Sequence, residues 1–165
     1  PVMGNSDSHH EGQTVGLPQT VVRAPSLSTN AVVRGLRGGH AWIAESSAVD
    51  LAFEASLGDR TAGCGEALDA GPTDLVDVRL TVSGAPGCLA QVIGPVTPLA
   101  GALTDAAGAA EVTVQVPAGL APFVRAEVRR TDGEPVLNPL AGVPGLAMVA
   151  LTNPVFLGAR PGTGR

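Results

Sequence analysis

Aromatic residues are nearly absent from this chain of 165 residues, in which Phe, Trp and Tyr together make up 2% of the composition. The chain has no tyrosine, and Trp42 is the only tryptophan. A hydrophobic core must therefore be built from Val, Leu and Ala, for which the hydrophobic fraction of 44% provides ample material. The scarcity of aromatic side chains also removes the surfaces on which single-stranded nucleic acids stack.

Positive charge is scarce as well. Ten Lys and Arg residues stand against fifteen Asp and Glu residues, which gives a formal net charge of −5, and no basic run occurs. Because nucleic-acid binding depends on cationic side chains that neutralise phosphates, we expect no nucleic-acid partner. No apolar stretch reaches the length of roughly 18 residues that marks a transmembrane helix, so we also expect no membrane span.

Glycine and proline are abundant, with 22 and 14 residues, and regular apolar runs separate them. This arrangement indicates many tight turns between short strands. Strand-like alternation of apolar and polar residues predicts strands over 49–54, 75–82, 88–93, 110–116, 123–130, 146–151 and 155–157. Residues 95–103 contain Pro98 and suit an edge strand or a loop. Asp132-Gly133 is a hairpin signal.

About seven short strands with frequent turns predict a mainly β fold, with an immunoglobulin- or fibronectin-like β-sandwich over residues 47–158. Residues 159–165 are expected to form a flexible tail. Residues 58–71 read as a polar, Gly-rich connection.

The first 46 residues have a different pattern. Residues 1–6 read as the end of a strand, and residues 19–24 and 40–45 as further extended segments. Between these two segments Ser28 is a good N-cap, and Leu27 and Val32 stand at the positions of a hydrophobic staple. Gly38-Gly39 ends the predicted helix.

Chemically reactive side chains are concentrated at the beginning of the chain. Asp7 and His9 are two residues apart, so in an extended segment their side chains lie on the same face, as two ligands of one metal would. A zinc site normally needs three or four protein ligands, and the other histidines are His10 and His40. Spacing alone therefore leaves a solvated polar loop as the simpler alternative.

The sequence around this pair resembles a known family. Residues 4–9 read Gly-Asn-Ser-Asp-Ser-His, and residues 12–22 continue Gly-Gln-Thr-Val-Gly-Leu-Pro-Gln-Thr-Val-Val. Together they resemble the last metal-binding motif of the PHP (polymerase and histidinol phosphatase) metallohydrolase superfamily. Residues 36–46, 123–129 and 148–157 look like parts of its exported, phosphoesterase-like branch. The resemblance spans roughly residues 2–157.

The resemblance implies that residues 1–46 are the C-terminal end of a distorted (β/α)7 barrel, with a strand, a loop and the last helix. Such barrels hold a cluster of divalent metal ions (Zn, Mn or Fe), and Asp7 and His9 match two of the ligands. The chain is then the C-terminal fragment of a phosphoesterase-like hydrolase, inactive alone, with the sandwich as scaffold. Its implied partners are the missing N-terminal barrel segment and a small-molecule phosphoester.

Three points stay open. The exported branch implies a secreted or periplasmic protein, in which Cys64 and Cys88 form a disulfide across two loops; the alternative is two reduced, partly buried thiols. The chain can instead be a non-catalytic β-sandwich that binds a partner or shapes a cleft. In a third interpretation Asp7 and His9 are incidental, and the chain is one β domain with an N-terminal arm.

Overall fold

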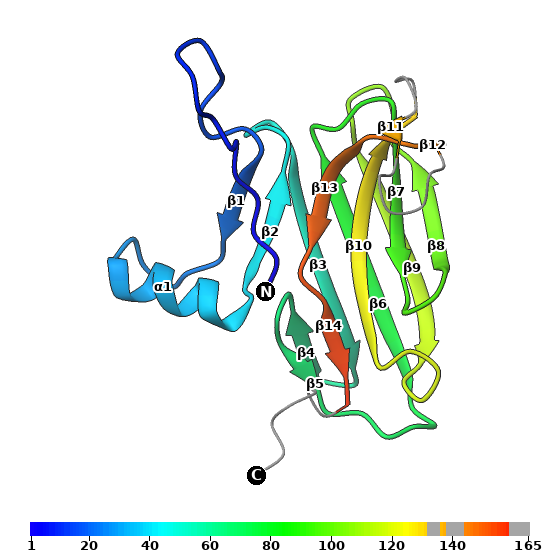
Figure 1. Cartoon of the computed structure of the whole chain (residues 1–165). Coiled ribbons are helices and arrows are strands. Elements are labelled where there is room, and N and C mark those ends of the chain that lie inside the picture. Colours follow the sequence, from blue (N-terminus) through cyan, green and yellow to red (C-terminus); the bar gives the residue numbers. More distant parts are fainter. Residues whose placement is uncertain (132–135, 138–143, 159–165) are drawn as a thin grey trace.

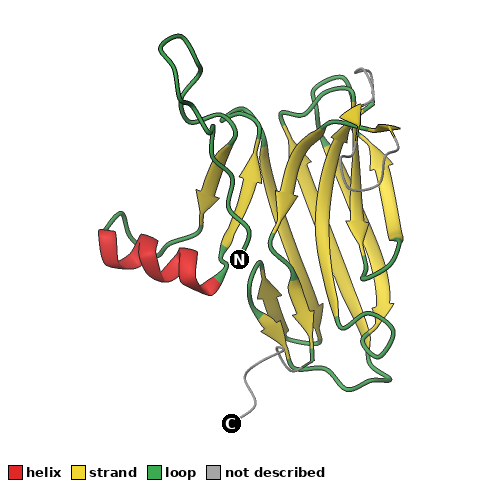
Figure 2. Cartoon of the chain, in the orientation of Figure 1, coloured by secondary structure: helices red, strands yellow, loops and turns green. Residues whose placement is uncertain are grey.

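Two β-sheets packed face to face make up most of the molecule (Figure 1). The computed structural model describes residues 1–131, 136–137 and 144–158. Within this part of the chain strands predominate, and α1 (Thr29–Gly38) is the one helix (Figure 2). The expected mainly β sandwich is confirmed at this level.

The larger sheet has eight strands and the smaller has four. The strands of the larger sheet are β1 (Gln19–Val22), β2 (Ala41–Ala44), β5 (Ala67–Leu68), β7 (Cys88–Ile93), β8 (Pro98–Leu103), β10 (Phe123–Arg130), β13 (Met148–Thr152) and β14 (Val155–Leu157). The strands of the smaller sheet are β3 (Asp50–Leu57), β4 (Arg60–Gly63), β6 (Leu75–Ser83) and β9 (Ala110–Pro117). A separate two-stranded pair is formed by β11 (Val136–Leu137) and β12 (Pro144–Gly145).

The core lies between the two sheets because their strands alternate in polarity. In β6 every second side chain is buried, and Val76, Val78, Leu80 and Val82 are each at most 1% exposed. On the facing sheet the buried residues of β10 are Val124, Ala126 and Val128. This alternation places one set of side chains on the core and the other in solvent. It is the reason why the longer strands were predictable from the sequence.

The segment before residue 46 continues the larger sheet. β1 pairs antiparallel with β2, and β2 pairs antiparallel with β13, with Ala44 opposite Ala150. In turn β13 pairs with β10, in the middle of the sandwich. Residues on both sides of the predicted domain boundary at 46 therefore share one hydrogen-bonded sheet.

The helix α1 begins and ends where its capping residues predict. The Ser28 Oγ accepts a hydrogen bond from the Ala31 N–H at 3.3 Å, and Gly39 adopts the left-handed conformation with φ of 77°. The hydrophobic staple is wrong, however, because Leu27 is fully exposed. The helix packs through its small residues Ala31 and Gly35, both of which are buried. With ten residues α1 cannot cross a bilayer, and the described residues contain no other helix.

Two further expectations differ from the structure. Residues 1–6 form no strand, and the backbones of Val2 and Gly4 bond to the side chains of Asn153 and Thr20 in place of a neighbouring strand. The connection at 58–71 contains β4 and β5, whose two to four residues are too short to show a period. The predicted hairpin turn at Asp132-Gly133 and the tail at 159–165 lie outside the described residues.

Candidate functional site

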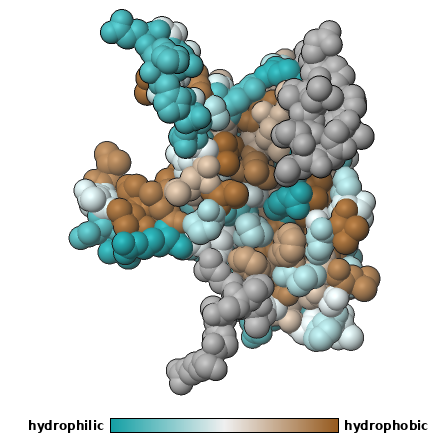
Figure 3. Space-filling model, in the orientation of Figure 1, coloured by the Kyte–Doolittle hydropathy of each residue, from teal (hydrophilic) through white to brown (hydrophobic). Residues whose placement is uncertain are grey.

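The loop that follows the N-terminal segment carries the predicted metal ligands. It projects away from the sheets, and its surface is mostly hydrophilic (Figures 1 and 3). The Asp7 Oδ1 and the His9 Nε2 lie 3.0 Å apart, and the two side chains are 86% and 69% exposed. The structure therefore brings the two predicted residues together at a position that is open to solvent.

The cause of this approach is a turn and not an extended strand. Asp7 has a positive φ of 46°, and its N–H donates to the Asn5 Oδ1 at 2.8 Å. The Gln13 Oε1 accepts hydrogen bonds from the backbone N–H groups of His9 and His10, at 2.6 and 3.0 Å. Side-chain-to-backbone bonds of this kind stabilise turns. The loop is thus ordered by its own polar side chains.

The distance between the two side chains suits a shared metal ion. Metal–oxygen and metal–nitrogen bonds of about 2.1 Å place neighbouring ligands roughly 3.0–3.4 Å apart when they subtend about 90–109° at the metal. The observed 3.0 Å falls in this range, and in this structure it is the length of a direct hydrogen bond between the His9 imidazole and the Asp7 carboxylate. Two ligands do not complete a site, and among the described residues no group of three or more His, Cys, Asp or Glu side chains could hold a metal. The structure thus shows two neighbouring side chains that could each donate one ligand atom, and no further ligand beside them among the described residues.

Two polar side chains fasten the N-terminal segment to the larger sheet. Asn153, between β13 and β14, accepts from the Val2 N–H at 2.7 Å and donates to the Val2 carbonyl oxygen at 3.1 Å. The hydroxyl of Thr20 on β1 accepts from the Gly4 N–H at 2.9 Å and donates to the Gly4 carbonyl oxygen at 2.8 Å. The segment that leads to Asp7 is thereby held at a fixed place on the sandwich.

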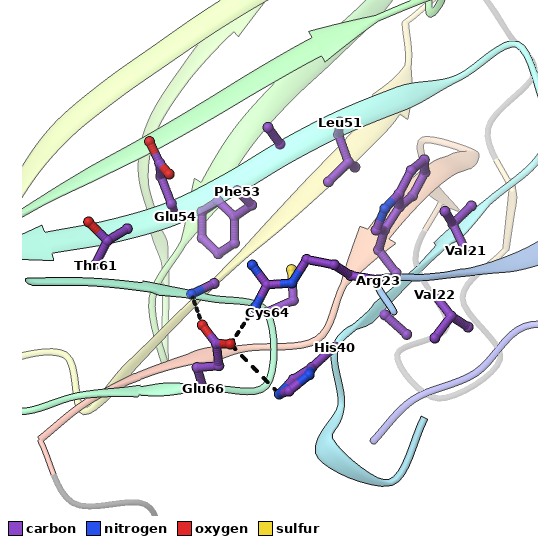
Figure 4. A pocket seen from close by; sticks show the side chains of 14 residues that line it. Val21, Val22, Arg23, His40, Leu51, Phe53, Glu54, Thr61, Cys64 and Glu66 are labelled. Carbon is purple, nitrogen blue, oxygen red and sulfur yellow. Dashed lines mark hydrogen bonds and ion pairs between the residues drawn. The ribbon is translucent and has the colours of Figure 1, made fainter. Parts of the chain in front are cut away.

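A cleft of about 570 Å³ opens between the two sheets, where β1 and β2 of the larger sheet face β3 and β4 of the smaller one. Its walls include Val21, Trp42, Leu51 and Phe53. Arg23, His40 and Glu66 also line it (Figure 4). The guanidinium of Arg23 donates to the Glu66 Oε1, and the His40 Nε2 lies 3.8 Å from the same oxygen.

The cleft residues are mostly ones that the sequence did not single out. Arg23 and Glu66 are separated by 43 positions, and Glu66 lies in a Gly-rich turn, so no local pattern links them. Of the individual residues considered from the sequence, His40, Trp42 and Cys64 line this cleft, and Trp42 is 9% exposed. Glu45 lies apart from both candidate sites and pairs with Arg130.

The two cysteines are not joined to each other. Cys88 is 1% exposed in the core, and its Sγ donates to the Pro86 carbonyl oxygen at 3.4 Å. Cys64 is half-buried and lines the cleft. Burial raises the pKa of the Cys64 thiol to about 11, so the thiol is protonated at neutral pH.

Arg125, Glu127 and Arg129 on β10 form a group of three charged side chains. The Glu127 carboxylate accepts from Arg125 at 2.7 Å and from Arg129 at 2.7 Å, and its side chain is only 8% exposed. Burial raises the pKa of Glu127, but the hydrogen bonds from the two guanidinium groups outweigh this and lower it. The group is closed on itself and has no free carboxylate oxygen.

Comparisons of this chain with protein-family models, with curated proteins and with solved structures find no match.

Proposed function

We propose that this chain is the C-terminal part of a PHP-type metal-dependent phosphoesterase, in which Asp7 and His9 supply one corner of the metal centre. The approach of the Asp7 carboxylate and the His9 imidazole to 3.0 Å on an exposed loop is the observation that carries the proposal. Carboxylate and imidazole ligands suit Zn, Mn and Fe. When bound, such ions polarise a phosphoester and activate water near neutral pH.

The chain's own contribution is to bind and to position. Asn5 and Gln13 hold the backbone of the ligand loop, so Asp7 and His9 are presented together before any metal arrives. Such preorganisation lowers the entropic cost of binding. The remaining ligands, in this proposal, belong to barrel strands that precede residue 1.

The sandwich acts in this proposal as the scaffold of the barrel. Residues 1–6, which form no strand in this chain, correspond in this proposal to the last barrel strand, and α1 corresponds to the last helix. β1 and β2 pair antiparallel, whereas neighbouring strands of an α/β barrel are parallel. We therefore assign β1 and β2 to the junction with the immunoglobulin-like sandwich, to which Asn153 and Thr20 fasten the ligand segment.

The experiment uses the longer protein in which this chain follows further barrel strands. Its metal content and its hydrolysis of bis(p-nitrophenyl) phosphate are measured for the parent and for Asp7→Ala, His9→Ala and His10→Ala. The proposal expects the first two variants to lose metal and at least ~100-fold in turnover, as removal of a direct participant does. The neighbouring His10 serves as the matched control, and its variant should retain both. Full metal content and activity in Asp7→Ala would contradict the assignment.

A second candidate is a binding module without catalysis, and the cleft between the sheets favours it. Its volume of about 570 Å³ lies within the usual range for small-molecule sites, and it combines apolar walls with a few polar groups. Titration of the chain with small organic ligands tests this function.

A further inference from the structure

The apolar side chains that line the cleft all point into it because side chains alternate between the two faces of a strand. Trp42 has the same orientation as Ala44, which is fully buried in the core between the sheets. Val21 lies opposite Trp42 in the register of β1 and β2, so both face the smaller sheet. From that sheet Phe53 and the partly buried Leu51 point back toward them. The result is an apolar slot at the open edge of the sandwich.

Arg23 stands at the mouth of this slot. Its position two residues after Val21 gives it the same orientation, and its backbone N–H extends the ladder by bonding to the His40 carbonyl oxygen at 2.8 Å. The guanidinium carries five N–H donors, and one nitrogen bonds to Glu66. Because the Arg23 side chain is 65% exposed, donors remain open to a ligand.

Glu66 holds the guanidinium in place. Its Oε1 accepts from Arg23, and its Oε2 accepts from the Gly63 N–H at 2.7 Å. Both oxygens of this carboxylate are thus engaged by the protein, whereas Arg23 has capacity left. The 34% exposed imidazole of His40, 3.8 Å from Glu66, adds a second nitrogen-bearing group at the mouth.

Glu54, the other carboxylate near the cleft, is directed away from the place where an anion would bind. Glu54 alternates with the core residue Phe53 and lies opposite Arg79 on the outer face of the smaller sheet. Figure 4 shows its carboxylate directed away from Arg23. Beside Glu66, whose two oxygens are engaged by Arg23 and Gly63, the Arg23 guanidinium is the charged donor at the mouth, and the groups behind it are largely apolar.

We infer that this cleft binds a small organic anion, a carboxylate or phosphate-type group on an apolar ring-sized body, with Arg23 as its anion donor. The ring lies against the wall formed by Val21, Trp42, Leu51 and Phe53, and Glu66 positions the guanidinium. The inference gives a ligand class to the binding-module function and does not depend on the metal pair of Asp7 and His9.

The test uses the single tryptophan as a reporter. Since Trp42 is the only one, its indole N–H gives one identifiable peak in a ¹H–¹⁵N correlation spectrum. The uniformly labelled chain is titrated with benzoate and with phenylphosphonate, and in parallel with neutral benzyl alcohol and with inorganic phosphate. We expect a saturable shift of the Trp42 peak with the two aromatic anions, at affinities at least tenfold above those of benzyl alcohol and phosphate.

Two substitutions separate the anion contact from the fold. Arg23→Gln should weaken the binding of both aromatic anions about tenfold or more, as loss of a charged hydrogen bond does. Arg79→Gln, which removes an exposed arginine of the outer face, should leave it unchanged. If Arg23→Gln disturbs the fold, the anion preference is still tested by comparing the charged and neutral probes on the unsubstituted chain. Equal binding of benzyl alcohol would overturn the anion assignment, and no saturable shift with any probe would overturn the binding function itself.

Discussion

The side-chain amide of Asn153 holds the main chain of Val2 across 151 positions of sequence, accepting at 2.7 Å and donating at 3.1 Å. The same amide nitrogen donates to the Ala41 carbonyl oxygen on β2 at 2.9 Å. Asn153 is 1% exposed, so it fulfils the hydrogen-bonding needs of a buried amide while joining three segments of the chain. Asn153 lies between the end of β13 and the start of β14, and the N-terminal segment packs against the sheet at this break between the two strands.

Replacement of this amide is expected to loosen the N-terminal segment. Asn153→Ala removes three hydrogen bonds and leaves backbone groups of Val2 and Ala41 without this partner, which should lower the free energy of unfolding by about 2–4 kcal/mol. Urea denaturation measures this change, and limited proteolysis reports whether cleavage near residues 1–16 becomes faster. Asn30→Ala, on the exposed side of α1, is the matched control and should change stability by less than ~0.5 kcal/mol. Equal stability of the two variants would show that the docking contributes nothing.

A glycine beside this junction is expected to tolerate no side chain. Gly65 has a φ of 80°, and a Cβ at this position would lie 2.3 Å from the Gly38 carbonyl oxygen and 2.5 Å from the Gly39 carbonyl carbon. Both neighbours are backbone atoms at the end of α1, so they cannot rotate away. We expect Gly65→Ala to lower the free energy of unfolding by more than ~3 kcal/mol, since the clash adds to the cost of a left-handed alanine.

Gly58 provides the control for this substitution. It has a similar φ of 62°, but nothing lies within 4 Å of its would-be Cβ. Gly58→Ala should therefore cost only the backbone term, about 1–2 kcal/mol. Chemical denaturation of both variants gives the difference directly. Similar losses would mean that α1 moves readily to make room at Gly65.

The alternation of apolar and polar residues made the longer strands predictable, whereas the cleft is formed by residues that only the strand order brings together. β6 and β9 alternate cleanly because one face lies on the core, and that pattern is visible in the sequence. β5 has two residues and pairs in parallel with β14, so no local signal exists for it. Likewise Arg23 and Glu66 meet only because β1 and β4 lie at the same edge of the sandwich.

The contact between Asp7 and His9 also depends on interactions that no sequence pattern shows. The proximity of Asp7 and His9 was predicted from the alternation of an extended chain, and the structure brings them together through a turn with Asp7 at positive φ. A spacing of two residues allows contact by either route. What the sequence could not supply is the set of hydrogen bonds, from Asn5 and Gln13, that selects the turn.

The group of Arg125, Glu127 and Arg129 predicts a dependence of stability on pH. The pKa of Glu127 is lowered in the folded state, although burial alone would raise it, because two guanidinium groups donate to the carboxylate. A lowered carboxyl pKa stabilises the fold above the unfolded value of about 4.3, and this contribution disappears as pH falls through the folded value. Unfolding free energies of the unsubstituted chain and of Glu127→Gln should therefore differ at pH 7, by about 2 kcal/mol.

The difference between these two proteins should shrink as the pH is lowered from 5 toward 2. Glu111→Gln is the matched control, because Glu111 also pairs with an arginine but its side chain is 51% exposed. An exposed pair contributes at most ~1 kcal/mol, so this variant should follow the unsubstituted chain closely. A constant difference between Glu127→Gln and the unsubstituted chain at all pH values would show that the loss comes from packing and not from charge.

The raised pKa of Cys64 predicts that its thiol is alkylated slowly. At pH 8 a thiol with a pKa of about 11 carries roughly 100-fold less thiolate than one with the ordinary value of 9.0, and the thiolate is the reactive form. Alkylation by iodoacetamide, followed at each cysteine by peptide mass spectrometry, should therefore be about 100-fold slower for Cys64 in the folded chain than in urea. Cys88, at 1% exposure, should react only as fast as the protein unfolds. Rapid alkylation of folded Cys64 would contradict its burial, whereas a peptide pair linked through Cys64 and Cys88 would show that the two thiols form a disulfide.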